Sequence, residues 1–142
     1  MREIMFRAKS KEDGEWVYGG YFKARGYLSG ETLHFIAPKE CESLPHGEFD
    51  FAIEVAPETL GQYTGLTDKN GTKIFEGDLV RLVRRKTGEL SKYVYEVFWD
   101  DDYVGFRMFF HKTGYREEFD GVPHWYVVVG NIHDNPELLK GE

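Results

Sequence analysis

The sequence lacks the features of secreted and membrane-spanning proteins. Cys41 is the single cysteine, which excludes a disulfide within the chain and suits a reducing compartment. No apolar run approaches the ~20 residues that a membrane-spanning helix needs. The N-terminal residues also lack an apolar stretch of the length found in signal peptides. We therefore expect a cytoplasmic protein that has no membrane partner.

Recognisable catalytic and ligand-binding motifs are equally scarce. The chain contains no Gly-x-Ser-x-Gly motif, Walker-type phosphate loop or dinucleotide fingerprint. His34, Cys41 and His46 are spaced unlike a compact zinc motif, and a second cysteine is missing. The aspartates at 100–102 are adjacent, but consecutive side chains of a strand point in opposite directions and converge on a cation only in a special turn. We therefore expect no enzymatic activity, no cofactor and no bound metal.

The sequence contains more acidic than basic residues. The formal net charge is −7 and the isoelectric point about 5.3, so nucleic-acid phosphates repel the chain unless a local basic patch overrides its charge. A hydrophobic content of 41% excludes general disorder, and the many Phe, Tyr and Gly residues favour strands and tight turns. With 142 residues, the chain is long enough to bury a core without disulfides or metal.

The clearest structural signal is a chain reversal between two apolar runs in the middle of the sequence. Asn70 and Gly71 tolerate positive φ, and together with Asp68 they are typical of a β-hairpin turn. Gly77 and Asp78 then interrupt the pattern directly before the next expected strand. A turn in that place recurs in small SH3-like barrels, where it leads the chain from one sheet to the next.

Alternating or apolar runs between turn signals predict many short strands. They cover residues 4–8, 15–22, 25–28, 31–37, 49–55, 60–66, 72–75, 79–83, 93–99, 104–110, 115–119 and 125–129. Gly19 and Gly20 suggest a bulge or a close backbone approach within the second of these strands. The continuous apolar run at 125–129 suits a central strand.

Near the end of the sequence, Asn135 can cap a single helical turn that begins at Pro136. Short strands with turns between them indicate a mainly β protein. We expect an N-terminal β-hairpin lobe at residues 1–57 and an SH3-like barrel lobe at residues 58–142, which ends in this helical turn.

Three blocks at the start, middle and end of the chain resemble one protein family. The blocks are residues 2–8 (REIMFRA), 62–80 (QYTGLTDKNGTKIFEGDLV) and 130–139 (GNIHDNPELL). They are similar to the YopX family of phage and prophage proteins. The resemblance implies a small, mainly β protein that a bacteriophage or prophage encodes and that acts in the cytoplasm of the bacterial host. It implies no reaction, because the family has no catalytic motif to carry over.

A cluster of basic residues departs most from the overall acidity. Its members are Arg81, Arg84, Arg85, Lys86 and Lys92. At a hairpin tip these cations could hold nucleic-acid phosphates, with Tyr93 and Tyr95 available for base stacking. Charged hairpin tips are also ordinary solubilising or edge-blocking devices.

Two functional hypotheses follow. The first is a non-enzymatic module that binds a host or phage protein, with residues 38–50 and 111–122 as contact surfaces because they match nothing familiar. The second is a nucleic-acid-associated protein that uses the basic hairpin between Arg81 and Lys92. Self-association through open strand edges would also suit this composition. Acidity alone would suit a mimic of DNA, although scattered lysines and arginines speak against it.

Overall fold

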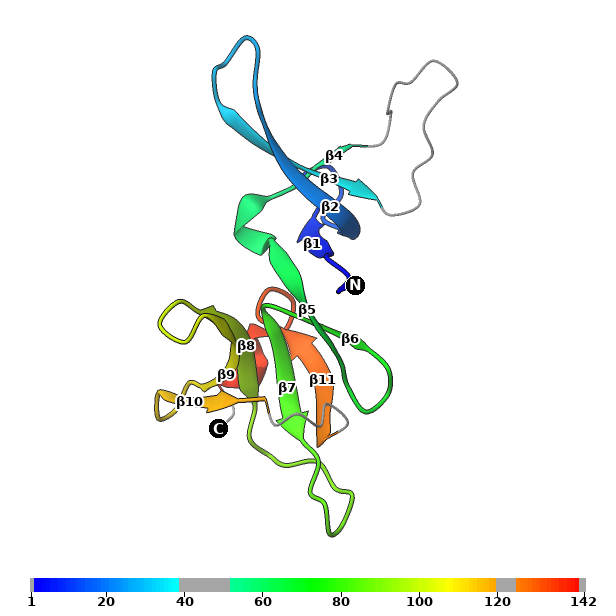
Figure 1. Ribbon diagram of the computed structural model, residues 1–142. Helices are drawn as coiled ribbons and strands as arrows, with labels where there is room; N and C mark the ends of the chain where they lie inside the picture. The colour runs from blue at the N-terminus through cyan, green and yellow to red at the C-terminus, as the bar shows by residue number, and fades with distance from the viewer. Residues whose placement is uncertain (1, 39–51, 120–124, 141–142) are drawn as a thin grey trace. The chain divides into compact units, whose positions relative to one another are not determined.

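A computed structural model describes residues 2–38, 52–119 and 125–140 (Figure 1). The chain divides into two compact units, Met1–Gln62 and Tyr63–Glu142, whereas the sequence patterns place the lobe boundary after residue 57. In the described ranges the fold is mainly β, as expected, and every strand pairing is antiparallel. No helix in these ranges is long and apolar enough to cross a membrane.

The first unit contains a sheet in the order β4-β3-β2-β1, and the start of β5 pairs with β1. Its elements are β1 (Phe6–Lys9), β2 (Trp16–Arg25), β3 (Thr32–Pro38), β4 (Ile53–Glu54), the 3-10 helix η1 (Pro57–Thr59) and the first residues of β5 (Gly61–Thr67). Ala8, Ile36 and Val55 are fully buried and form its core. The three residues lie on the same face of the sheet. Side chains of a strand point alternately to its two faces, so the neighbours of these residues lie on the other face.

The glycines of β2 have the role that the sequence indicates. A Cβ atom on Gly19 would lie 1.9 Å from the carbonyl oxygen of Ala37 on β3. Any side chain there would therefore push the two strands apart. The close backbone approach expected at Gly19 and Gly20 is confirmed at Gly19, whereas a Cβ atom on Gly20 would meet no described atom within 4 Å.

The turn between β2 and β3 is longer than the sequence patterns predict. The strand expected at 25–28 ends at Arg25, and Tyr27 and Leu28 lie in the turn instead. Gly26 donates its N–H to Glu31 O at 2.7 Å, and Gly30 donates to Gly26 O at 2.9 Å. These backbone bonds close a turn over residues 26–30 and leave the two large apolar side chains at its end.

The second unit pairs the rest of β5 with β6 and contains a further sheet. Among the described residues, that sheet has five strands in the order β10-β9-β8-β7-β11. The elements are β6 (Lys73–Phe75), β7 (Asp78–Leu82), β8 (Tyr95–Asp100), β9 (Gly105–Phe110), β10 (Tyr115–Glu118), β11 (Tyr126–Asn131) and the 3-10 helix η3 (Pro136–Leu139). No described pairing joins β10 to β11, so the sheet is open and the expected SH3-like barrel is not confirmed.

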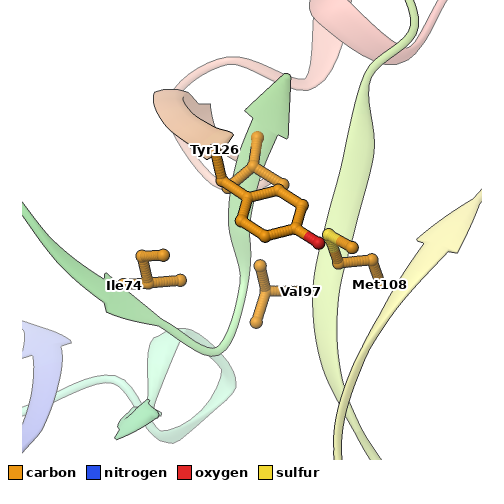
Figure 2. Packing of buried hydrophobic residues seen from close by; sticks show 5 residues of the cluster. Ile74, Val97, Met108 and Tyr126 are labelled. Carbon is orange, nitrogen blue, oxygen red and sulfur yellow. The ribbon is translucent and has the colours of Figure 1, made fainter. Parts of the chain in front are cut away.

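The core of the second unit lies where β6, β7, β8, β9 and β11 meet (Figure 2). Its fully buried side chains are Ile74, Val80, Val97, Met108 and Tyr126. Val97 and Met108 lie in strands that the sequence patterns predict at 93–99 and 104–110. The second of these predictions is wrong at Val104, which lies in the turn before β9 and not in the strand.

The turn between β5 and β6 is built around Asp68, as the sequence indicates. The buried Asp68 carboxylate accepts N–H bonds from Asn70 at 2.8 Å and Thr72 at 2.9 Å. Gly71 has a φ of 81°, which glycine adopts without steric cost. The β-hairpin expected around residues 68–71 is therefore confirmed.

The same turn also reaches strand β11. Asp68 Oδ2 accepts the N–H of Val128 at 2.9 Å, and Lys69 donates its N–H to Tyr126 O at 2.9 Å. The apolar run at 125–129 is not a central strand, because β11 ends the five-stranded order. Its apolar character has a physical reason nonetheless, since the Asp68 turn covers part of its outer edge.

The interruption at Gly77 and Asp78 is a buried, hydrogen-bonded turn. Asp78 Oδ2 accepts the N–H of Phe75 at 2.7 Å, and Gly77 donates its N–H to Val97 O at 2.8 Å. The first bond holds the end of β6 against the start of β7, and the second ties the turn to β8. This turn therefore fixes the change of direction that the sequence predicts.

Pro136 occupies the first turn of η3, but Asn135 does not cap it. The Asn135 side chain instead accepts the N–H of Asn131 at 3.1 Å. A Cβ atom on Gly130 would lie 2.6 Å from Asn135 Oδ1, so glycine at 130 leaves the space that this side chain occupies. The cap prediction at Asn135 is wrong because the preceding turn uses its oxygen.

Candidate functional site

The basic cluster expected from the sequence is divided by the structure. Arg84, Arg85 and Lys86 are exposed in the turn between β7 and β8, which is closed by an N–H bond from Arg84 to Glu89 O at 2.8 Å. Arg81 lies half-buried on β7, and its Nε has no hydrogen-bond partner among the described residues. Lys92 is exposed farther along the chain. The structure therefore brings together three of the five cations.

The aromatic residues near these cations are partly engaged. Arg85 lies over the Trp125 ring at 5.0 Å, and Lys92 lies over the Tyr93 ring at 5.3 Å. Tyr93 and Tyr95 both pack against Phe110, with ring centroids 5.5 and 5.4 Å apart. Tyr95 is half-buried, so Tyr93 is the more accessible of the two for stacking.

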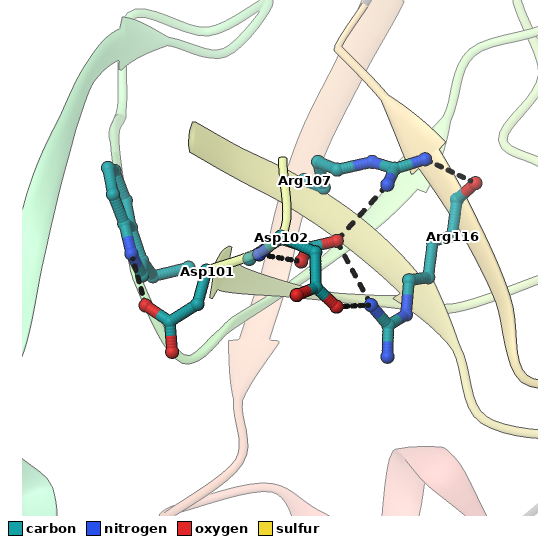
Figure 3. A network of polar contacts seen from close by, with 6 residues as sticks. Asp101, Asp102, Arg107 and Arg116 are labelled. Carbon is teal, nitrogen blue, oxygen red and sulfur yellow. Dashed lines mark hydrogen bonds and ion pairs between the residues drawn. The ribbon is translucent and has the colours of Figure 1, made fainter. Parts of the chain in front are cut away.

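A second group of polar side chains gathers at the end of the β8–β9 hairpin (Figure 3). The buried Asp100 carboxylate accepts bonds from Arg107 Nη1 at 3.1 Å and Arg116 Nη1 at 3.2 Å. Asp102 donates its N–H to the other Asp100 oxygen at 3.1 Å. Strands β9 and β10 supply the two arginines, so one carboxylate ties three strands together at this place.

The electrostatics of Asp100 favour its charged form. Burial alone would raise its pKa, but the N–H bond from Asp102 and the charge of Arg116 oppose that effect. The bond to Arg107 acts in the same direction, and the pKa of Asp100 lies below its usual value. Hydrogen bonds and positive charges directed at a carboxylate stabilise its anion. Asp100 is therefore a stable negative centre that holds both arginines.

The three adjacent aspartates are directed to different partners. Asp100 binds both arginines, and Asp101 accepts a bond from Trp99 Nε1 at 2.9 Å. The almost fully exposed Asp102 carboxylate lies 4.0 Å from Arg116 Nη1. Within the described ranges, no group of three or more His, Cys, Asp and Glu side chains could hold a metal ion. The run at 100–102 thus serves the turn through separate hydrogen bonds.

Large apolar side chains are exposed at the same hairpin end, with Trp99 on the face of the sheet opposite Arg107, since Trp99 pairs with Phe106 and Arg107 pairs with Phe98. Trp99, Tyr103 and Val104 are 41%, 47% and 74% exposed. Trp99 packs edge-on against Phe106 at 5.1 Å, and Arg107 lies over the Tyr103 ring at 4.8 Å. Val104 has a φ of 57°, an unfavourable value for a β-branched residue, and its N–H bond to Asp100 O at 2.7 Å holds it there. We call Trp99, Tyr103, Val104, Arg107 and Arg116 the hairpin-end surface.

Sequence reasoning missed the hairpin-end surface as a unit. The signal is present only in part: Arg107 and Arg116 stand at outward positions of two expected strands. Which residue each arginine meets depends on the strand register, which pairs Arg107 with Phe98 and Arg116 with Phe109. A pattern of single residues does not contain that register.

The other sequence candidates fall partly outside the described residues. Cys41, His46 and most of the expected contact segment 38–50 lie there, as do residues 120–122 of the second segment. His34 lies on β3, where its Nδ1 is 2.7 Å from the hydroxyl of Tyr21. From the segment at 111–122, His111 pairs with Glu96 at 2.7 Å and Tyr115 is exposed on β10.

The described strands form antiparallel sheets, which makes this a mainly β protein. The family model described as "YopX protein" matches residues 5–140, so the chain belongs to the YopX family, as the three sequence blocks indicate. Among solved structures, the chain is similar to the crystal structure of protein EF1440 from Enterococcus faecalis. The two are 25% identical over 98% of this chain and 99% of that chain, with a TM-score of 0.52. No curated protein matches the chain significantly.

Proposed function

We propose that this YopX-family protein is a non-enzymatic binding module that recognises another protein through its hairpin-end surface. The observation that supports the proposal is the exposure of Trp99, Tyr103 and Val104 at the hairpin end that also carries two arginines. Trp, Tyr and Arg are the residues that most often supply the binding energy of protein interfaces. The phage or prophage origin that the family implies suggests a host or phage protein in the bacterial cytoplasm as the partner.

The contacts within the surface favour binding because they hold the side chains in place before a partner arrives. Trp99 is held by Asp101 and Phe106, and Tyr103 is held by Arg107. An immobilised side chain loses little conformational entropy on association. Arg116 is bonded to Asp100 yet remains 45% exposed, so part of its guanidinium group can donate to a partner. An apolar centre with a polar rim is the usual anatomy of a protein interface.

The proposal is tested by affinity capture from lysates of phage-induced host cells. The wild-type chain should retain a specific protein, and the double variant Trp99→Ser, Tyr103→Ser should lose it. Leu90→Ser is a matched control, because Leu90 is similarly exposed at the other end of the same unit. Equal capture by the wild-type and double-variant chains, both shown to be folded by circular dichroism, would rule out this surface.

The second candidate function is association with nucleic acid through the basic turn. It rests on Arg84, Arg85 and Lys86, which are exposed side by side and form no ion pair in the described part of the chain. The native protein should shift labelled DNA or RNA in a gel at low salt, and Arg84→Glu with Arg85→Glu should weaken the shift and reduce its salt dependence. Lys112→Glu removes an exposed charge elsewhere in the unit and serves as the control. Native protein that shifts no nucleic acid at low salt ends this alternative.

A further inference from the structure

The β2–β3 hairpin of the first unit has one face made entirely of apolar residues and glycine. The register pairs Gly20 with Ala37, Phe22 with Phe35 and Ala24 with Leu33. Directly paired residues of antiparallel strands lie on the same face, and alternate residues of each strand share it. We define the arm face by this set, together with Tyr18: Tyr18, Gly20, Phe22, Ala24, Leu33, Phe35 and Ala37.

The opposite face of the hairpin is different. Its paired residues include Lys23 with His34 and Arg25 with Thr32, and only Ile36 reaches the core. The charged side chains of the hairpin therefore stand on this face, together with Tyr21 and Ile36, whereas the arm face holds only apolar residues and glycine. A hairpin that exposed both faces to water would have no physical reason for this separation.

The arm face continues to an apolar tip. Tyr18 and Phe22 are each 43% exposed, and Phe22 stacks on Phe35 with centroids 5.3 Å apart. At the tip, Tyr27 is 98% and Leu28 95% exposed. Contiguous exposed apolar surface of this kind marks interaction sites on soluble proteins.

Beyond its base, the hairpin has no third strand beside it in the described ranges. Strand β1 pairs with β2 only as far as Gly19, and β4 pairs with β3 only at Phe35 and Ile36. A two-stranded hairpin alone is marginally stable in water. A surface that covers the arm face would therefore also stabilise this part of the hairpin.

We propose that a second copy of this chain covers the arm face, so that two hairpins pack face to face and run in opposite directions. The arm face itself carries no charge, although Glu54 (paired with Phe35) and Arg7 (paired with Tyr18) lie on the same side of the sheet beside it. Lys23 and Arg25 point away from the contact. Apolar sheet faces pack on one another about 10 Å apart, as in β-sandwiches. The opposite directions give a closed two-fold arrangement, in which each copy offers the same patch.

The arm face and the apolar tip, Tyr27 and Leu28, together have enough exposed area for the centre of such a dimer. If a fully exposed aromatic side chain offers about 200 Å², the four side chains Tyr18, Phe22, Tyr27 and Leu28 together offer roughly 500 Å². A standard interface buries about 800 Å² on each partner. The four exposed side chains thus provide more than half of that area, and the other residues of the arm face lie directly beside them.

A cavity at the base of the hairpin fits the tip of the second copy. It has a volume of about 130 Å³ and is lined by Glu3, Ile4, Met5, Gly19 and Gly20. Cavities of roughly 150 Å³ accept a benzene molecule. This one is of similar size and has Ile4 and Met5 beside Glu3 in its lining, so it has room for the side chain of Leu28. If the two-fold axis passes beside Ala24, Leu28 of each copy lies opposite Gly20 of the other. In this arrangement glycine at position 20 keeps the cavity open, because it has no side chain to fill it.

Sedimentation equilibrium of the full chain tests the proposal. The wild type should reach twice the 16.5 kDa mass of one chain in a concentration-dependent manner. Leu28→Asp should raise the dissociation constant of the dimer by about tenfold or more, because it places a charge in an apolar contact. Leu28 has almost no contacts within its own chain, so this variant should fold as the wild type does.

A second variant acts on the receiving side of the contact. A Cβ atom at Gly20 would meet no described atom within 4 Å, so Gly20→Leu can be accommodated there and would occupy the cavity. It should weaken the dimer to a similar extent. Leu90→Asp, in the other unit, and Lys23→Glu, on the opposite face of the hairpin, should leave the mass unchanged. A wild type that is monomeric at every concentration would overturn the proposal. A dimer that both Leu28→Asp and Gly20→Leu leave equally tight would do so too.

Discussion

Two buried carboxylates of the second unit hold turns of the chain in different ways. Asp68 accepts only backbone N–H groups, one of them from β11. Asp100 accepts bonds from backbone N–H groups of its own turn and from two arginine side chains, which are 21% and 45% exposed. The first carboxylate therefore fixes the path of the backbone, and the second fixes side chains at the surface. We expect substitutions at Asp68 to change stability, and substitutions at Asp100 to change the hairpin-end surface.

The largest effect is expected for Asp68→Ala. The substitution removes three hydrogen bonds to a charged group, from the N–H groups of Asn70, Thr72 and Val128. Asn70 and Thr72 are exposed and can bond water instead, whereas Val128 is half-buried. The free energy of unfolding should fall by about 3 kcal/mol, measured by urea denaturation. Asp102→Ala is the matched control, because the Asp102 side chain is exposed. A midpoint equal to that of the control would mean that the Asp68 turn contributes little.

A smaller loss of stability is expected for Asp100→Asn. The neutral side chain no longer compensates Arg107 and Arg116, but both arginines reach water, which screens their repulsion. The thermal midpoint should fall by less than half of the change seen for Asp68→Ala. Hydrogen exchange should accelerate at the amides of Asp102 and Val104, while Asn70 and Thr72 keep their protection. Uniform acceleration at both turns would contradict a local role for Asp100.

The smallest effect is the pH dependence that Asp100 contributes. Its pKa is lowered in the folded state, whereas an unfolded aspartate has a pKa of about 3.9. The charged carboxylate therefore stabilises the fold above about pH 4, and this stabilisation is lost as the pH falls through the lower folded-state pKa. The difference in thermal midpoint between the wild type and Asp100→Asn should be constant near neutral pH and shrink below about pH 4. A difference that grows in acid would contradict the assignment.

Local chemistry made much of the backbone predictable from the sequence. The turn at Asp68, Asn70 and Gly71 depends on residues within five positions of one another, and so does the break at Gly77 and Asp78. Such turns are specified by the residues that form them. The mainly β class and the family followed from the same kind of local pattern.

The predictions that failed depend on contacts between residues that are far apart in the sequence. The run at 125–129 is as apolar as a central strand, because the turn at Asp68, not another strand, lies along part of its edge. Tyr27 and Leu28 were assigned to a strand, because nothing in their neighbourhood shows that the turn spans residues 26–30. The arginines of the hairpin-end surface meet Asp100 only through the strand register. Sequence patterns contain no information on that register, so this site became visible only in the structure.

The hydrogen bond from Val128 to Asp68 has a consequence for biosynthesis. Its two partners are 60 residues apart, so the ribosome has made nearly the whole chain before the acceptor meets its last donor. Residues 1–62, in contrast, can emerge and form their own sheet while synthesis continues. A nascent chain halted before β11 would lack this donor to Asp68, so the second unit closes only after β11 has been made.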